Sequence, residues 1–420
     1  MNKLENKISD FEIMSPAGNF ECLMAAIQGG ANSVYFGVEK LNMRSKSANN
    51  FKLEQLAEIA EICRSNNIKS YLTLNIVMYN DDLEDMRKIV REVKRTGISA
   101  VIASDQSAIA YAHECGVEVH ISTQLNISNI ESLKFYAQYA DVIVLARELN
   151  LTQVAEIHKQ IHEQQIKGPS GNLIKIEMFA HGALCMSVSG KCYLSLHEYN
   201  YSANRGTCLQ TCRRAYTVTD KETGAQFDID NQYIMSPKDL CTIGFLDKMT
   251  AAGVSVFKIE GRARSAEYVK TVCNCYSNAL KSIADGTYSK QKIEEWMTQL
   301  GNVFNRGFWD GYYLGQRLGE WSKGYGNQSP KHKEYVAKCT NFFGNIGVSE
   351  FLIEAGELKI GDEILIIGST TGVIEQTITE IRVDLQLVAK AEKGVYCSIV
   401  TPEKVRRGDK VYRIVVSHKS

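Results

Sequence analysis

The sequence predicts an α/β protein, a (β/α)8 TIM-like barrel with a cysteine-rich insertion, followed by a small C-terminal all-β barrel. Three observations support this class. Eight apolar runs alternate with amphipathic helical patterns, a cysteine-rich stretch separates the last two runs, and short strand patterns with Gly or Asp turns close the chain. A chain of 420 residues is also too long for one ordinary core, which predicts two or three domains.

The eight runs are nearly continuous in apolar residues, as parallel strands buried on both faces require. Eight strands with intervening helices favour a closed barrel over the alternative of a doubly wound open sheet. The runs are Phe11–Ser15, Ser33–Gly37, Lys69–Asn75, Ser99–Ser104, Glu118–Thr123, Asp141–Ala146, Ile174–Ala180 and Val254–Gly261.

The segments between these runs have the period of amphipathic helices. Two examples are residues 52–67, "KLEQLAEIAEICRSNN", and 82–97, "DLEDMRKIVREVKRTG", which ends at a Gly stop signal. No glycine-rich G-x-G run stands between a first strand and its helix, so a dinucleotide-binding fold is not expected.

The spacing of the runs also predicts the domain boundaries. The barrel takes residues 1–320, with an insertion at about 181–253 between the seventh and eighth strands. Residues 321–334 read as a linker, and 335–420 as the small β-barrel. Barrel enzymes carry their chemistry on loops that follow strand ends, so the insertion is a functional candidate.

Charge and composition narrow the class of protein. The formal net charge is zero, so binding to nucleic acid requires a local basic patch. The N-terminus has no apolar leader and no long apolar run follows, which predicts a cytoplasmic protein without a membrane span. Twelve cysteines in a reducing compartment are buried residues, metal ligands or nucleophiles rather than disulfides.

Four cysteines of the insertion have the spacing C-x6-C-x15-C-x3-C. They are Cys185, Cys192, Cys208 and Cys212, and Cys241 is a possible substitute for the last. Four thiolates suit a tetrahedral zinc ion or a 4Fe–4S cluster, because both take soft anionic sulfur. The plain alternative is a set of buried structural cysteines.

Basic and aromatic side chains are interleaved around these cysteines. The stretch from Cys185 to Arg214 has one acid, Glu198, and this composition suits phosphate contact and base stacking. A solvated loop is the alternative. The basic residues are Lys191, Arg205, Arg213 and Arg214, and the aromatic ones are Tyr193, Tyr199 and Tyr201.

Polar residues follow several of the predicted strands. Glu177 and His181 flank the end of the seventh and are candidates for acid–base catalysis together with Glu260, although a structural pair is an equal alternative. Arginine and lysine side chains at one rim suit the binding of carboxylate or phosphate, or simply pair with neighbouring acids. The rim candidates are Arg44, Arg147, Lys258 and Arg262.

A long sequence motif that includes two of the four cysteines resembles the signature of a known protein family. The stretch Glu177–Ser195, "EMFAHGALCMSVSGKCYLS", resembles the collagenase-like peptidase family through the pattern E-x-F-x2-G-A-L-C-x4-G-x-C-x-L-S. Further segments agree, namely "MSPAGN", "ARELN", "NRGTCLQTCR", "MSPKDL" and "KIEGR". The "NRGFWDGYYLG" segment and the terminal strands are similar to its tRNA hydroxylation branch.

The resemblance implies an iron–sulfur enzyme that modifies tRNA. It implies a 4Fe–4S cluster on Cys185, Cys192, Cys208 and Cys212, or on Cys241 in place of the last, and 5-hydroxylation of the wobble uridine. Prephenate is the implied co-substrate, a dicarboxylate for which Arg44, Arg147 and Arg262 are candidate clamps. The anticodon region of tRNA is the implied partner.

Three other functions stay open. The first is a collagenase-like peptidase, although no H-E-x-x-H, G-x-S-x-G or P-loop motif occurs. The second is a zinc-stabilised tRNA-binding or chaperone protein without catalysis. The third is ribosomal-RNA cytidine hydroxylation, whose enzymes share the core but carry a longer C-terminal part.

Overall fold

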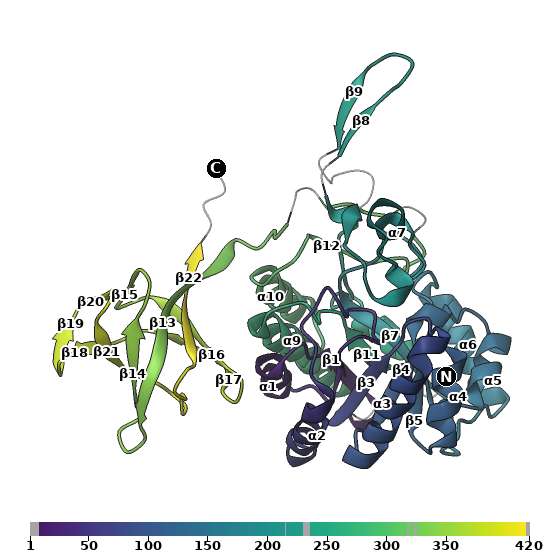
Figure 1. The fold of residues 1–420 in the computed structure, drawn as a ribbon, viewed down its shortest axis with the longest axis horizontal. Helices are drawn as coiled ribbons and strands as arrows, with labels where there is room; N and C mark the ends of the chain where they lie inside the picture. Colours follow the sequence, from purple (N-terminus) through teal and green to yellow (C-terminus); the bar gives the residue numbers. More distant parts are fainter. Residues whose placement is uncertain (1–7, 215, 230–235, 317–318, 323–325, 417–420) are drawn as a thin grey trace.

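The computed structural model describes residues 8–214, 216–229, 236–316, 319–322 and 326–416. It shows a barrel surrounded by helices, a C-terminal all-β unit beside it, and a hairpin that projects from the barrel mouth (Figure 1). The predicted linker, 321–334, includes residues 323–325, which lie outside the described residues.

Eight parallel strands close into the barrel, which confirms the predicted fold class. Each strand pairs with the next in chain order, and the last, β11, pairs with both β7 and β1. The strands are β1 (Glu12–Pro16), β2 (Ser33–Gly37), β3 (Lys69–Leu74), β4 (Ala100–Ala103), β5 (Glu118–Ile121), β6 (Val142–Val144), β7 (Lys175–Gly182) and β11 (Val254–Ile259).

Helices cover the outside of the barrel. The helix at Leu83–Thr96 matches the predicted pattern, and it ends at Gly97, whose φ of 77° places it in the left-handed region that favours glycine. The α-helices are α1 (Phe20–Gln28), α2 (Leu56–Ser65), α3 (Leu83–Thr96), α4 (Gln106–Glu114), α5 (Ile130–Ala137), α6 (Leu151–Glu163), α8 (Leu246–Ala251), α9 (Ala266–Ala284) and α10 (Lys290–Gly301). Short 3-10 helices are η1 (Ile8–Asp10), η2 (Leu53–Gln55), η3 (Asn80–Asp82) and η4 (Thr123–Leu125).

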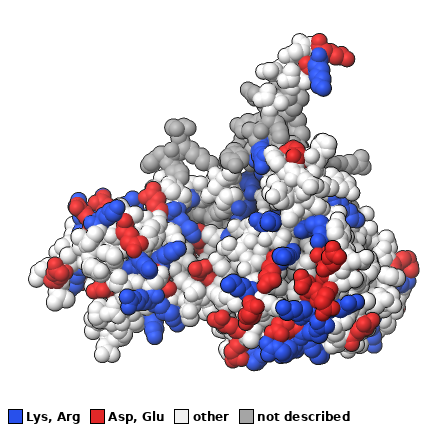
Figure 2. All heavy atoms as spheres, in the orientation of Figure 1, with Lys and Arg blue, Asp and Glu red and all other residues white. Residues whose placement is uncertain are grey.

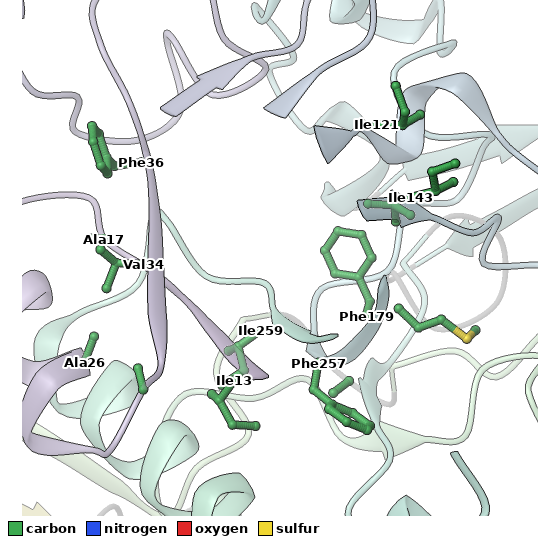
Figure 3. Close-up of a cluster of buried hydrophobic side chains, with 14 of the residues drawn as sticks. Ile13, Ala17, Ala26, Val34, Phe36, Ile121, Ile143, Phe179, Phe257 and Ile259 are labelled. Atoms are coloured by element: carbon green, nitrogen blue, oxygen red, sulfur yellow. The ribbon is translucent and has the colours of Figure 1, made fainter. Parts of the chain in front are cut away.

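Two apolar clusters give the barrel its core. The larger lies between the strands and the helices, and Figure 3 shows part of it, where Ile13 and Phe257 of the paired strands β1 and β11 lie side by side. A smaller cluster takes residues from six barrel strands, among them Met14, Tyr71 and Val256. Alternating side chains therefore fill both the outer layer and the interior.

The insertion follows β7 and leads back to β11. Its strand β10 (Asp239–Cys241) pairs antiparallel with β7, and β12 (Phe308–Trp309) pairs with β10. Its other elements are α7 (Leu194–Tyr199), η5 (Ala203–Arg205), η6 (Thr211–Arg213) and the projecting hairpin of β8 (Tyr216–Thr219) and β9 (Gln226–Ile229). The insertion thus lies at the C-terminal end of β7, where barrel enzymes place their sites.

The C-terminal unit is an antiparallel eight-stranded sheet in the order β17-β16-β22-β13-β14-β21-β18-β19, beside the ribbon β15–β20. It packs on the barrel through α1, where the Gln28 amide nitrogen donates to the Thr371 carbonyl at 3.0 Å. Its strands are β13 (Lys331–Phe343), β14 (Val348–Ile353), β15 (Glu357–Lys359), β16 (Glu363–Gly368), β17 (Gly372–Thr377), β18 (Ile381–Val383), β19 (Gln386–Val388), β20 (Lys390–Glu392), β21 (Tyr396–Val400) and β22 (Lys410–Val416).

Acidic and basic side chains are interspersed over the barrel and the C-terminal unit on the face that Figure 2 shows. Within the described residues, no helix is long and apolar enough to cross a membrane.

An ion pair inside the barrel gives the first prediction. The Lys258 ammonium lies 2.6 Å from Oε1 of Glu177, whose side chain is fully buried. Lys258→Met leaves that carboxylate without its cation, so we expect the free energy of unfolding to fall by about 3–5 kcal/mol. Urea denaturation measures the change.

The double variant Lys258→Met/Glu177→Gln is the matched control, because it removes both charges. It should recover a large part of the loss. If Lys258→Met is as stable as the wild type, the pair does not hold the barrel interior together.

Candidate metal centre and anion cavity at the barrel mouth

A cavity of about 170 Å³ opens at the C-terminal ends of the barrel strands, beneath the insertion. Seven of the residues that line it are Lys or Arg, and one, Glu260, is an acid. Such an excess of cations in a partly buried space favours anionic occupants. The cations are Arg44, Arg147, Arg213, Lys258, Arg262, Arg264 and Arg306.

All four predicted cysteine ligands line this same cavity. Cys185 is exposed, and Cys192, Cys208 and Cys212 are half-buried. Burial raises the pKa of the Cys212 thiol to about 11, opposed by Arg213, and the negative charges of Cys185, Cys208 and Cys192 raise it further. The pKa of Cys212 therefore depends on the charges of the other three thiols of the cavity.

This set fits a soft metal ion or an iron–sulfur cluster by its chemistry, because four thiols line one cavity that has a surplus of positive charge. Within the described residues, however, no three His, Cys, Asp or Glu side chains already stand in a metal-binding arrangement. Burial keeps the Cys212 thiol protonated near neutral pH, and it would lose that proton on binding a metal.

A close backbone approach holds the cysteine loop against the barrel. Gly206, two residues before Cys208, has φ of 76°, and a β-carbon there would lie 2.1 Å from the Asn42 carbonyl oxygen. The Ser45 hydroxyl donates to the Gly206 carbonyl at 3.1 Å. Only glycine fits this contact, which joins the insertion to the loop that carries Arg44.

Glu260 organises the floor of the cavity. The Arg44 guanidinium lies 2.7 Å from its carboxylate, and the Tyr35 hydroxyl donates to it at 3.2 Å. Burial by itself raises the pKa of Glu260, but Arg44, Arg262 and Arg147 outweigh burial and lower the pKa to about 2. Glu260 is therefore a permanent anion near neutral pH and is unsuited to carry a proton there.

Four arginines of the cavity, Arg147, Arg213, Arg262 and Arg264, have no carboxylate at ion-pair distance among the described residues, and two of them face the Glu260 side of the cavity. Arg262 is buried and donates to Asn42 Oδ1 and Thr73 Oγ1, both at 3.0 Å, and burial lowers its pKa to about 10. Arg147 donates to the Ala183 carbonyl at 3.3 Å and stacks 3.7 Å from the centre of the Phe179 ring. Within the described residues neither has a carboxylate at ion-pair distance, so both retain capacity for an anionic ligand.

The comparisons with known proteins agree on one family. The model of peptidase family U32 matches residues 18–323, which include the barrel and the insertion. The chain belongs to peptidase family U32. A protein of Porphyromonas gingivalis named collagenase is 61% identical over 406 residues, 97% of this chain and 98% of that protein.

Relatives with other names also match. A tRNA hydroxylation protein of Bacillus subtilis is 32% identical and covers 70% of this chain and 69% of its own length. A 23S rRNA 5-hydroxycytidine synthase of Escherichia coli is 34% identical and covers 65% of this chain, but only 40% of its own length. Family U32 thus holds proteins named for peptide cleavage and for RNA hydroxylation.

Some predicted site residues of this U32 chain lie away from the cavity. His181 packs outside the barrel, with Nδ1 3.3 Å from the Tyr276 hydroxyl, and burial followed by the charge of Arg264 lowers its pKa to about 3. Glu177 instead pairs with Lys258 inside the barrel, so the structure does not bring Glu177 and His181 together. His181 is neutral at physiological pH and does not line the cavity.

Two further candidates, Arg205 and Cys241, make contacts that stabilise the fold and do not line the cavity. The Arg205 guanidinium donates to Asp82 Oδ1 at 3.0 Å and stacks on Tyr79, so it ties the insertion to the loop after β3. Cys241 is buried beside Tyr276, 3.8 Å from its hydroxyl, and does not line the cavity with the other four cysteines.

The sequence interpretation missed Arg264 and Arg306, which both line the cavity. Arg264 stands two residues after Arg262 in the loop that follows β11, so its place after a strand end was an available signal. Arg306 offered no such signal, because it reaches the cavity through the pairing of β12 with β10 and an ion pair of 3.2 Å with Asp239.

The charge of Glu260 gives a pH-dependent prediction. Its pKa in the folded protein, about 2, lies below its ordinary value of 4.5, so folding favours the ionised form. Glu260 therefore contributes stability above about pH 4.5 and loses it as the pH falls towards 2. Compared with Glu260→Gln, the wild type should be more stable by about 2–3 kcal/mol at pH 7.

Urea unfolding midpoints of both proteins from pH 3 to 7 measure this difference. The two curves should converge below pH 4.5. A difference that is constant across the range would show that the contribution of Glu260 does not depend on its charge.

Proposed function

We propose that this chain is an enzyme that hydroxylates RNA, with a 4Fe–4S cluster held by Cys185, Cys192, Cys208 and Cys212. The observation that carries the proposal is the placement of all four thiols in one cation-rich cavity at the barrel mouth. Thiolates are strong ligands for iron–sulfur clusters, and their negative charge complements the arginines. The names of the RNA-modifying relatives add support.

The proposed reaction is 5-hydroxylation of the wobble uridine in tRNA. Replacing a ring C–H bond by C–OH is a two-electron oxidation, so the reaction needs a hydroxyl donor or an oxidant. When bound, the cluster supplies electron-transfer chemistry that protein side chains lack. The protein residues orient the base and the donor around it.

Arg44, Arg147 and Arg262 are the proposed clamp for a prephenate-linked donor. The last two have no carboxylate partner among the described residues, so a dicarboxylate can supply their missing charge. Arg44 is held by its ion pair with Glu260, so its proposed role is to position the clamp and not to supply an unpaired charge. Lys258, paired with Glu177, lies over the Tyr35 ring at 4.7 Å and adds positive charge to the cavity floor.

The proposed partner is the anticodon region of tRNA. Tyr193, Tyr199 and Tyr201 are 69%, 43% and 42% exposed on the insertion, so their rings are available to stack on unpaired bases. A cytoplasmic location is part of the proposal, since tRNA is the substrate.

Zinc is the alternative occupant of the same four thiols, because it takes four thiolates equally well. Zinc has no redox chemistry, and a zinc-bound form would be an RNA-binding protein rather than a hydroxylase. Ribosomal RNA is the alternative substrate and is supported by the rRNA-modifying relative.

Peptide cleavage is the second candidate function, because the relative named collagenase is 61% identical. The cavity argues against it. Of the described residues that line it, none is a histidine, its one acid, Glu260, is a poor proton acceptor with a pKa of about 2, and Lys258 is paired with Glu177. The cavity therefore offers Ser122 and Ser189 no histidine or basic carboxylate to activate them.

The test is nucleoside mass spectrometry of tRNA from a deletion strain that carries each variant. Cys185→Ala should reduce 5-hydroxyuridine to the level of the empty deletion strain, because a ligand is lost. Cys115→Ala is the matched control, since Cys115 is half-buried at the end of α4 and outside the cavity, and it should restore the wild-type level.

A casein and collagen digestion assay on the same purified proteins separates the alternatives. Cleavage by the wild type that is lost in Cys185→Ala, with unchanged 5-hydroxyuridine in all strains, would overturn the proposal in favour of a peptidase. Loss of 5-hydroxycytidine from ribosomal RNA instead would identify ribosomal RNA as the substrate.

A further inference from the structure

We propose that a second hollow, next to the cysteine cavity, binds a backbone phosphate of the RNA strand whose base enters the cavity. This outer cleft is defined by five basic residues, Lys46, Arg213, Arg214, Arg264 and Arg306. The inference rests on the proposed function and adds to it a separate subsite for the backbone.

The two hollows are continuous. Five residues line both of them, and the outer cleft has a volume of about 520 Å³. An extended RNA strand can therefore lie along the outer cleft while one of its bases turns past Cys208 into the inner cavity. The shared residues are Cys208, Gln210, Arg213, Arg264 and Arg306.

The charge of the outer cleft is unbalanced. None of the described residues that line it is Asp or Glu. Asp239, which does not line the cleft, offsets one of these charges through its ion pair with Arg306. Arg213 and Arg264 have no carboxylate at ion-pair distance among the described residues, so a bound anion can balance their charge.

The side chains of the cleft differ in their capacity for a ligand. Arg213 is occupied, because it donates to Ser236 Oγ at 2.9 Å and to the Pro237 and Leu184 carbonyls, both at 2.8 Å. Arg306 is paired with Asp239. Arg264 instead stacks on Phe304, with its guanidinium carbon 3.6 Å from the ring centre, and has no carboxylate at ion-pair distance among the described residues.

Lys46 completes the proposed subsite from the opposite loop. It is exposed in the segment after β2 and makes no ion pair with any described residue. Stacking holds the plane of the Arg264 guanidinium, which can then offer two parallel N–H groups, while Lys46 adds a mobile charge. A phosphodiester, whose single negative charge is shared by two acceptor oxygens, suits this pair.

The test uses the salt dependence of RNA binding by the full-length, metal-loaded protein. The probe is a synthetic tRNA anticodon stem-loop, and its Kd is measured from 50 to 300 mM KCl for the wild type, Lys46→Gln and Arg264→Gln. Each lost phosphate contact lowers the slope of log Kd against log salt by about 0.7, and weakens binding about fivefold at 100 mM salt.

Lys40→Gln and Arg64→Gln are the matched controls. Lys40 is exposed in the same loop as Lys46 and does not line the cleft, and Arg64 is exposed on α2. Both controls should keep the wild-type slope. Since Lys46 is exposed, its substitution tests the subsite even if Arg264→Gln disturbs folding.

An unchanged slope in Lys46→Gln, or the same change in the controls, overturns the subsite, and so does a wild type that does not bind the stem-loop. A wild type that binds with the expected slope changes, but from which no hydroxylated nucleoside forms in cells, supports the subsite and refutes the hydroxylase proposal. The two failures are therefore distinguishable.

Discussion

The chemistry of the cavity at the barrel mouth depends on its excess of positive over negative side chains. Among the described residues that line the cavity, Glu260 is the one acid beside seven cationic side chains, and the arginines lower its pKa to about 2. Glu260 and Arg44 neutralise each other, whereas Arg147 and Arg262 have only neutral partners among the described residues. The cavity therefore favours anions, and the four thiols that line it can supply part of the missing negative charge when they are deprotonated.

The fold explains why these groups meet. A closed parallel barrel puts the C-terminal ends of its strands at one rim, so residues distant in sequence become neighbours. The insertion after β7 then brings the cysteines over that rim, and the close approach of Gly206 to Asn42 fixes its position. Arg213 lines the cavity and also donates to the carbonyl groups of Leu184 and Pro237, near the two ends of the insertion. The same side chain therefore helps to hold the insertion over the cavity.

The eight barrel strands could be predicted from the sequence because both faces of each are buried, and the cysteine-rich insertion could be located because it interrupts the alternation of strands and helices. The orientation of His181 could not. The pairing of β7 with β11 is irregular between Phe179 and His181, and this turns His181 outward to Tyr276. The local sequence also could not show that Arg205 forms an ion pair with Asp82. Nor could it show that the pairing of β12 with β10 brings Arg306 to the cavity.

The central claim is that the four cysteines hold an iron–sulfur cluster, and elemental analysis of the anaerobically purified protein tests it most directly. Iron, acid-labile sulfide and zinc are measured together with the visible absorbance. The account predicts about four iron and four sulfide per chain, a brown solution, and loss of both in a Cys212→Ala variant. One zinc per chain without iron, or iron content that is unchanged in Cys212→Ala, would contradict it.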